Sequence, residues 1–278
     1  MFKIAVDAGH CLKTAGKRLH KKLDATETRE WTLNDRVARY FAEAATLYEG
    51  VELLRVDDTS GKKEVSLSAR CKASNAWGAD MYISMHHNAG INLGTGGGIV
   101  AYSYKEKTKG AEYRDAIYAA CIAAGGLVGN RYDPTLTANF YVIKNTKAPA
   151  VLMEYGFMDS KTDVPVILDV NYSKLMGYAT MEAIAKVAGL KKKVTAKPVE
   201  DTGKVKLELP ILKRGVKGEA VEAMQILLNG YGYSCGDKGA DGSFGPATEE
   251  AVEKYQKAAG LTVDGSCGPK TWSNLLGI

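Results

Sequence analysis

The chain opens with the apolar run Lys3-Ile4-Ala5-Val6-Asp7-Ala8-Gly9-His10, which finishes on a histidine. Two similar runs follow: Met81-Tyr82-Ile83-Ser84-Met85-His86 finishes on a second histidine, and Ala150-Val151-Leu152-Met153-Glu154 finishes on a carboxylate. Short runs that are apolar at consecutive positions are typical of strands covered on both faces. In open α/β sheets, ligands bind beyond the carboxyl ends of such strands. The three runs therefore predict a site where the two histidines and the carboxylate meet.

Length and composition indicate a soluble protein with more than one domain. The chain has 278 residues, of which 45% are hydrophobic and 25% are charged. That length favours two domains, and the composition is ordinary for globular proteins. No apolar stretch reaches the roughly 20 residues that cross a bilayer, so we expect no stable membrane insertion. The N-terminus lacks the features of a signal peptide; we expect a protein held in the cytoplasm until something else releases it.

The number of cysteines and the distribution of charge argue against two further kinds of protein, those built on cysteine cross-links or cysteine-zinc sites and those that bind nucleic acid. There are five cysteines and no Cys-x-x-Cys pair, which argues against a disulfide framework and against a cysteine-zinc site. Whether Cys235 and Cys267 pair is left open. The net charge is +5, and residues 191–206 carry +4 of it, with six lysines against Glu200 and Asp201. A nucleic-acid groove would instead spread lysine and arginine over a folded face with aromatics between them. We therefore expect no nucleic-acid partner.

Residues 1–190 alternate strand and helix patterns. Apolar stripes at helical spacing run from Leu33 to Tyr48, from Tyr113 to Ala124 and from Leu175 to Val187. Alternating strands and helices predict an α/β domain, with a mostly parallel twisted sheet and helices on both faces. The expected strands are Lys3–Val6, Val51–Val56, Met81–Met85, Gly98–Tyr102, Phe140–Ile143 and Ala150–Met153.

The rest of the chain has a different pattern. Residues 191–206 are polar and charged, without an apolar period, and predict a linker between domains. Residues 207–278 predict a small all-α domain of three helices. Within it, Asp241-Gly242-Ser243-Phe244-Gly245-Pro246-Ala247-Thr248 recurs 23 residues later as Asp264-Gly265-Ser266-Cys267-Gly268-Pro269-Lys270-Thr271. Each copy places a proline where the first turn of a helix tolerates it.

The histidines are candidate metal ligands. His10 and His86 both end expected strands that can be neighbours. A hydrolytic zinc site often has two histidines and one glutamate, so a carboxylate is needed as the third ligand. Glu27 and Glu30 both precede the next helix; we prefer Glu30, which lies closer to the packed helix. The same donor set also forms the facial triad of non-haem Fe(II) oxygenases.

Glu154 is the remaining carboxylate of the site. It follows four apolar residues, so we expect it to be partly desolvated, which raises a carboxylate pKa, whereas a nearby metal ion lowers it. Such a residue can take a proton from water and pass it to a leaving amine. The alternative interpretation is a structural glutamate paired with a buried base.

Five motifs occur together over residues 1–190: Val6-Asp7-Ala8-Gly9-His10, Glu30-x-x-x-Asn34, Leu67-Ser68-x-Arg70, Ala79-Asp80-Met81-Tyr82-Ile83-Ser84-Met85-His86-His87-Asn88-Ala89 and Ala148-Pro149-Ala150-Val151-Leu152-Met153-Glu154-Tyr155-Gly156-Phe157. With these motifs the chain resembles the zinc-dependent N-acetylmuramoyl-L-alanine amidases of bacterial cell walls. This resemblance implies Zn²⁺ as cofactor, with His10, Glu30 and His86 as its ligands and Glu154 as the catalytic acid–base. Through the spacing to Asn34, it also decides for Glu30 over Glu27.

The chain departs from this family at two positions. Cys11 stands where the family usually has glycine, and we expect its thiol to make the site sensitive to oxidation. His87 stands where a small residue is usual. Because side chains alternate along a strand, His87 should point away from His86, where it would support the ligands or face the substrate.

The C-terminal residues resemble the three-helix peptidoglycan-binding domain of many wall hydrolases, through the two repeats and Tyr255-Gln256-Lys257. Together the two resemblances imply hydrolysis of the amide between N-acetylmuramic acid and L-alanine in bacterial peptidoglycan. We expect a phage-type endolysin that lyses the wall. The alternatives are a host autolysin with the same chemistry and a non-catalytic wall-binding protein; the oligomeric state is left open.

Overall fold

The computed structural model describes residues 1–193 and 209–276. The chain divides into two compact units, residues 1–197 and residues 198–278. Most of the predicted linker, residues 194–206, lies outside the described residues, so the predicted domain boundaries stay a prediction. In the described residues, no helix has both the length and the apolar character that crossing a membrane requires.

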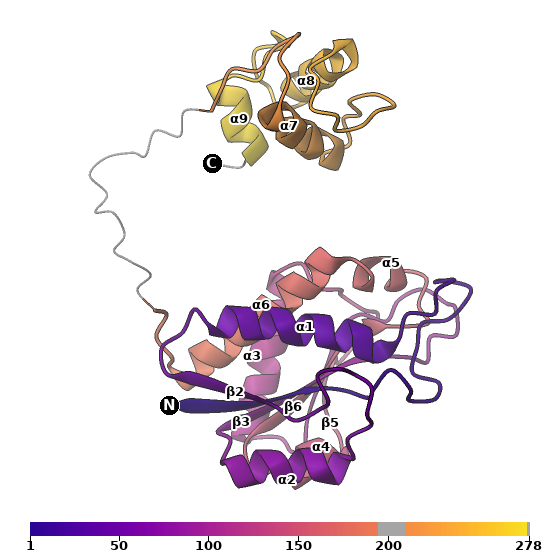
Figure 1. The fold of residues 1–278 in the computed structure, drawn as a ribbon, viewed down its shortest axis with the longest axis vertical. Helices are drawn as coiled ribbons and strands as arrows, with labels where there is room; N and C mark the ends of the chain where they lie inside the picture. The colour runs from indigo at the N-terminus through magenta and orange to yellow at the C-terminus, as the bar shows by residue number, and fades with distance from the viewer. Residues whose placement is uncertain (194–208, 277–278) are drawn as a thin grey trace. The chain divides into compact units, whose positions relative to one another are not determined.

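The N-terminal unit is built on one six-stranded sheet, shown in Figure 1, with the strand order β2-β1-β3-β6-β4-β5. β2, β1, β3 and β6 run parallel, whereas β4 runs antiparallel to β6 and pairs in parallel with β5. This arrangement confirms the predicted mostly parallel sheet. The strands are β1 (Phe2–Ala8), β2 (Val51–Arg55), β3 (Met81–Asn88), β4 (Val100–Ser103), β5 (Thr135–Thr137) and β6 (Ala150–Phe157).

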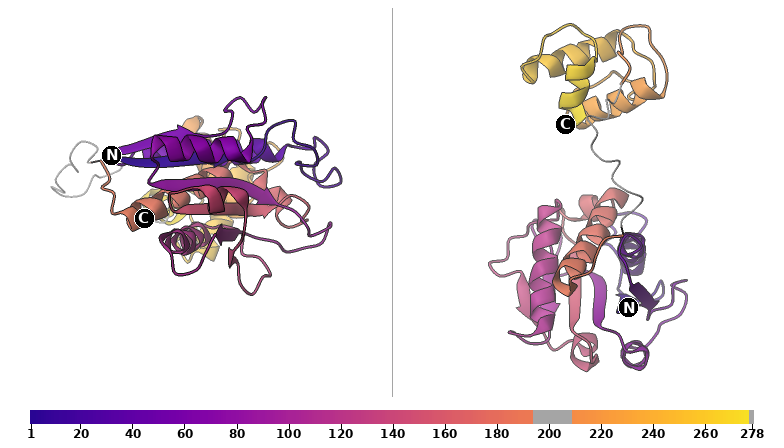
Figure 2. Two further views of the ribbon diagram at one scale, coloured as in Figure 1. Left: turned by 90° about the horizontal axis from the view of Figure 1, so that it is seen from below. Right: turned by 90° about the vertical axis from the view of Figure 1, so that its left-hand side faces the viewer.

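Helices cover both faces of this sheet (Figures 1 and 2). One face carries α1 (Glu30–Ala45), α3 (Lys109–Ala123), α5 (Val164–Ile167) and α6 (Val170–Ala188). The other face carries α2 (Leu67–Trp77) and the short α4 (Tyr141–Asn145). Strand residues alternate between the two cores. Ile83 and Met153 face the larger core, and Tyr82 and Leu152 face the core under α2 and α4.

The predicted strand Phe140–Ile143 is wrong, because α4 begins at Tyr141 and the fifth strand is Thr135–Thr137. A four-residue apolar run cannot be told from a buried helical turn by periodicity alone. Here Val142 and Ile143 are buried, while Phe140 and Tyr141 stay 42% and 44% exposed. The observed edge strand, β5, has a single leucine between two threonines, so no apolar run in the sequence indicates it.

The C-terminal unit is all-helical, as predicted. Its helices are α7 (Glu219–Gly230), α8 (Pro246–Ala258) and α9 (Pro269–Leu276). They pack around a separate core that includes Phe244, Tyr255 and Trp272. All five cysteines of the chain are buried and unpaired, which agrees with the expected absence of a disulfide framework and shows Cys235 and Cys267 as free thiols.

Two buried glutamines explain the repeated Asp-Gly-Ser segment. Gln256 Nε2 donates to Asp264 Oδ1 at 2.8 Å and to Thr271 Oγ1 at 3.0 Å, and its Oε1 accepts the Gly265 N–H at 3.1 Å. Gln225 makes the equivalent three hydrogen bonds in the first copy, with Asp241, Thr248 and Gly242. Each repeat is therefore a turn fastened to the side-chain amide of the preceding helix.

Replacing Gln256 by alanine should lower the free energy of unfolding of the C-terminal unit by about 2–3 kcal/mol, because buried donors and acceptors lose their partners. Hydrogen exchange of peptides from residues 209–276, measured by mass spectrometry, checks this. Lys257→Ala, at the exposed neighbouring position, is the control and should leave exchange unchanged. Equal exchange in Gln256→Ala and wild type would show that this clamp does not stabilise the unit.

Candidate active site

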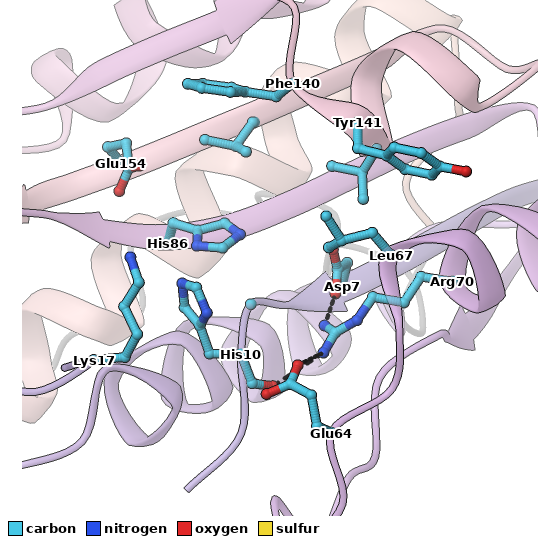
Figure 3. Close-up of a pocket in the computed structure, with 13 residues that line it drawn as sticks. Asp7, His10, Lys17, Glu64, Leu67, Arg70, His86, Phe140, Tyr141 and Glu154 are labelled. Carbon is cyan, nitrogen blue, oxygen red and sulfur yellow. Dashed lines mark hydrogen bonds and ion pairs between the residues drawn. The ribbon is translucent and has the colours of Figure 1, made fainter. Parts of the chain in front are cut away.

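Three separate elements bring the predicted ligands together. His10 follows β1, Glu30 is the first residue of α1, and His86 lies in β3. One ligand atom from each of these residues lies within 4.8 Å of the others. Figure 3 shows both imidazoles in the same pocket as the fourth predicted residue, Glu154. That residue is the register partner of His86 across the β3–β6 pairing.

Two of these residues lie within strands rather than at their ends. β3 continues past His86 to Asn88, and β6 continues past Glu154 to Phe157. The strands continue because alternate residues, such as Tyr155, remain in the apolar core on the opposite face. The site is therefore on the α2 and α4 side of the sheet, close to its carboxyl edge, rather than wholly beyond that edge.

The backbone at the end of β1 makes room for the cluster. A side chain at Gly9 would overlap the imidazole ring of His86, so only glycine permits this approach. His10 has φ of 67°, a left-handed conformation that is uncommon for a residue other than glycine. This turn directs the His10 ring toward Glu30, with 3.3 Å between Nε2 and Oε1.

Glu30 is fully buried and is the centre of the cluster. Its Oε1 lies 3.1 Å from His86 Nδ1 and 3.3 Å from His10 Nε2. Burial pushes the pKa of Glu30 up, but the hydrogen bonds and charges of the two histidines outweigh it and hold the pKa well below its usual range. The rejected alternative, Glu27, instead pairs with Arg18 at 3.0 Å.

The Glu154 carboxyl group has a different environment. Its Oε2 is buried and has no hydrogen-bond partner in the described residues. Burial raises its pKa to about 8, opposed by the nearby charge of His86 and reinforced by that of Glu30. No salt bridge to a buried base is present in the described residues, so the alternative interpretation of a structural ion pair finds no partner here.

His87 lies on the other side of β3, as the alternation of side chains predicts. It is buried, and its Nδ1 lies 2.8 Å from Asn34 Oδ1. Asn34 Nδ2 in turn donates to the Gly9 carbonyl at 3.1 Å and approaches Glu30 Oε1 at 3.5 Å. His87 therefore supports the cluster through Asn34 and does not face the substrate. Burial lowers its pKa to about 3, so the ring is neutral.

A buried ion pair that the sequence did not assign fastens the loop of His10. Arg70 donates to the Asp7 carboxylate and, at 3.1 Å each, to the carbonyls of Ala8 and His10. The second Asp7 oxygen accepts the hydroxyls of Tyr82 and Ser84. Asp7 and Arg70 both occur in the motifs quoted above. An aspartate inside an apolar run is the one signal that a buried partner exists.

Cys11 is buried, and its Sγ accepts the Lys13 N–H at 3.3 Å and the Thr14 hydroxyl at 3.5 Å. It does not belong to the group of candidate ligands. The expected sensitivity of the site to oxidation stays a prediction.

The cluster opens into a pocket of about 250 Å³. Its apolar lining residues come from α2, α4 and β6, and Figure 3 shows Lys17, His86 and Glu154 together on one side of it. The lining residues are Asp7, Gly9, His10, Lys17, Glu64, Leu67, Arg70, His86, Phe140, Tyr141, Val142, Leu152 and Glu154.

The donor set fits a divalent transition metal. Two imidazole nitrogens and a carboxylate oxygen converge, and the second oxygen of Glu30 is buried without a hydrogen-bond partner in the described residues. A buried charge without enough partners is costly, and a cation at this point would supply one. Three protein ligands leave a further coordination position for water or substrate, which is typical of hydrolytic sites.

Comparison with known proteins agrees with this geometry. The profile of the N-acetylmuramoyl-L-alanine amidase family matches residues 4–186, and a profile described as a putative peptidoglycan binding domain matches residues 217–275. The chain belongs to the N-acetylmuramoyl-L-alanine amidase family. It hydrolyses the bond between N-acetylmuramic acid and L-alanine, so the function predicted from the sequence is confirmed at this level.

Three similar proteins illustrate the match. A sporulation-specific N-acetylmuramoyl-L-alanine amidase of Bacillus subtilis (strain 168) is 29% identical over 215 residues, 77% of this chain and 76% of that protein. The N-acetylmuramoyl-L-alanine amidase CwlM of Bacillus licheniformis is 28% identical over 199 residues, 70% and 72% of the two chains. The catalytic domain of CwlV, from Bacillus (Paenibacillus) polymyxa var. colistinus, shares the fold with a TM-score of 0.60 and 20% identity, over 69% of this chain and 100% of that one.

Gly9→Ala should displace the His86 ring, because the new methyl group occupies its position. We expect the free energy of unfolding to fall by about 1–3 kcal/mol, as in other overpacked sites, with the imidazole moved away from Glu30. Urea unfolding and a crystal structure of the variant check this. Wild-type stability with His86 still in hydrogen-bond contact with Glu30 would contradict the close approach.

Proposed function

We propose that the N-terminal unit is a zinc-dependent amidase in which His10, Glu30 and His86 hold the ion and Glu154 carries the proton. The observation that supports it most is the convergence of these donors around a fully buried carboxylate. Zinc, when bound, polarises a carbonyl group and lowers the pKa of a water molecule.

The environment of Glu154 suits it to proton transfer. A general base works best when its pKa is near the working pH, and burial shifts this carboxyl group in that direction; a bound cation would lower its pKa again. Glu154 accepts a proton from the water that attacks the lactyl carbonyl. It then returns the proton to the alanine nitrogen as the C–N bond breaks. In the part of the chain that the structure describes, its Oε2 has no hydrogen-bond partner, which leaves that oxygen available for both transfers.

The pocket and the second unit position the substrate. Leu67, Phe140 and Tyr141 form an exposed apolar rim along one wall, which can cover the methyl groups on either side of the scissile amide and exclude water. The C-terminal unit, in the same chain, raises the effective concentration of the enzyme on an insoluble polymer. The partner is bacterial peptidoglycan, as the family of this unit indicates.

Glu154→Gln should retain zinc yet lose at least about a hundredfold in wall-lytic activity, because proton transfer contributes that much or more. His86→Ala should lose both zinc and activity. Metal analysis and release of soluble fragments from purified peptidoglycan check the two effects. Glu49→Gln, an exposed glutamate outside the site, is the control. Normal clearing of wall suspensions by Glu154→Gln would contradict the role assigned to this residue.

The same preparations separate the rival interpretations. An Fe(II) oxygenase would contain iron and would need no residue in the position of Glu154. A non-catalytic wall-binding protein would create no new alanine amine termini in digested peptidoglycan. Zinc in the wild type, with new amine termini on L-alanine, supports the amidase over both.

For the biological setting, we propose an endolysin that stays in the cytoplasm until a membrane pore releases it to the wall. The pairing of an amidase unit with a peptidoglycan-binding unit supports a lytic role. A host autolysin is the alternative, and the sporulation-specific relative in Bacillus subtilis supports it.

Production of the chain inside a bacterium whose wall it degrades in vitro separates the two settings. We expect such cells to grow normally until a pore-forming peptide permeabilises the membrane, and then to lyse within minutes. Cells producing Glu154→Gln serve as the control. Lysis without permeabilisation, or export of the protein by intact cells, would favour the autolysin.

A further inference from the structure

Lys17 is a cation in the pocket that the proposed mechanism does not use. It lies in the loop between β1 and α1, and its backbone is held because its carbonyl accepts the Glu30 N–H at 3.1 Å. The Nζ atom is 3.6 Å from Glu30 Oε2, and the side chain is 42% exposed. Figure 3 shows the ammonium group on the same side of the pocket as Glu154 and His86.

The Lys17 ammonium group has donors that make no hydrogen bond in the described residues. A lysine offers three donors, yet in the described residues Nζ makes one ion pair, at 3.6 Å, that is longer than a hydrogen bond. The other cation that lines the pocket, Arg70, is buried and fully engaged with Asp7, Glu64 and three carbonyls. Lys17 is therefore the lining cation available to an incoming anion.

The apolar wall of the pocket offers no partner to a charged group. It consists of Leu67, Phe140, Tyr141, Val142 and Leu152, and an unpaired charge against such a wall is destabilising. A substrate with an apolar part and an anionic part close to the scissile amide would thus be oriented in one way. Its methyl groups would face α4, and its anion would face Lys17.

The substrate has such an anion. In peptidoglycan stems, the residue after L-alanine is D-glutamate joined through its γ-carboxyl group. Its α-carboxylate is then free, or is amidated in some walls. This α-carboxylate is the acidic group of the stem nearest to the scissile bond, only one residue away from it.

We propose that Lys17 binds the free α-carboxylate of the second stem residue and so makes the enzyme selective for stems that are not amidated there. This inference rests on the proposed amidase function. A charge-assisted hydrogen bond to a partly exposed lysine favours the carboxylate over the carboxamide by about tenfold in kcat/KM. The discrimination should appear mainly in KM, because the contact is made in the ground state as well as in the transition state.

Two synthetic muramyl tripeptides test this inference, identical except for an α-carboxylate or an α-carboxamide on the second residue. With the zinc-loaded full chain, the carboxylate substrate should have the higher kcat/KM, by about tenfold. In Lys17→Gln this ratio should fall toward one, chiefly through a higher KM for the carboxylate substrate. Lys17→Arg retains the charge and should keep most of the preference.

A matched control and a second readout exclude a structural explanation. Lys21→Gln removes the same charge from an exposed position in the same loop and should leave the ratio unchanged. Zinc affinity, measured by competition with a chelating dye, should be similar in wild type and Lys17→Gln. If Lys17→Gln instead loses zinc affinity and slows both substrates equally, Lys17 only orients Glu30, and the inference is wrong.

The remaining outcomes are also decisive. Equal cleavage of the two tripeptides by the wild type would overturn the inference and leave the amidase function standing. Cleavage of neither tripeptide, with peptidoglycan also left intact by the zinc-loaded wild type, would overturn the proposed function and this inference with it.

Discussion

The buried carboxylate of Glu30 is the constraint on which the site depends. It has no exposed surface and lies between the imidazoles of His10 and His86. Burial of a charge costs several kcal/mol unless partners compensate it, so β1, β3 and α1 must all deliver donors to one point. The glycine before His10 and the left-handed turn at His10 are local consequences of that requirement.

The two faces of the sheet carry different parts of the site. On the α2 and α4 side of the sheet, His86 and Glu154 lie side by side at the pocket. On the opposite side, His87 holds Asn34, which in turn holds the loop after β1. The Asp7–Arg70 pair fastens the same loop from beneath the pocket. Two networks thus hold the loop after β1 from two sides, and such support keeps a site in its productive geometry.

Much of this arrangement follows from sequence patterns, and the exceptions have physical causes. Strand runs predict His10, His86 and Glu154 near one another because parallel strands bring equivalent ends together. The α4 turn was predicted as a strand because four apolar residues carry no period. The role of Arg70 depends on a contact with Asp7 across 63 residues, and no local pattern encodes such a contact. No sequence pattern singles out Lys17, and only the folded loop shows that it lines the pocket.

The most direct test of the central claim is a crystal structure of the zinc-loaded protein, with anomalous diffraction recorded on both sides of the zinc absorption edge. We expect a single strong peak bonded to one nitrogen each of His10 and His86 and to a carboxylate oxygen of Glu30, with Glu154 nearby and not bonded. A peak elsewhere, or one in which Glu154 replaces Glu30 as ligand, would contradict the account.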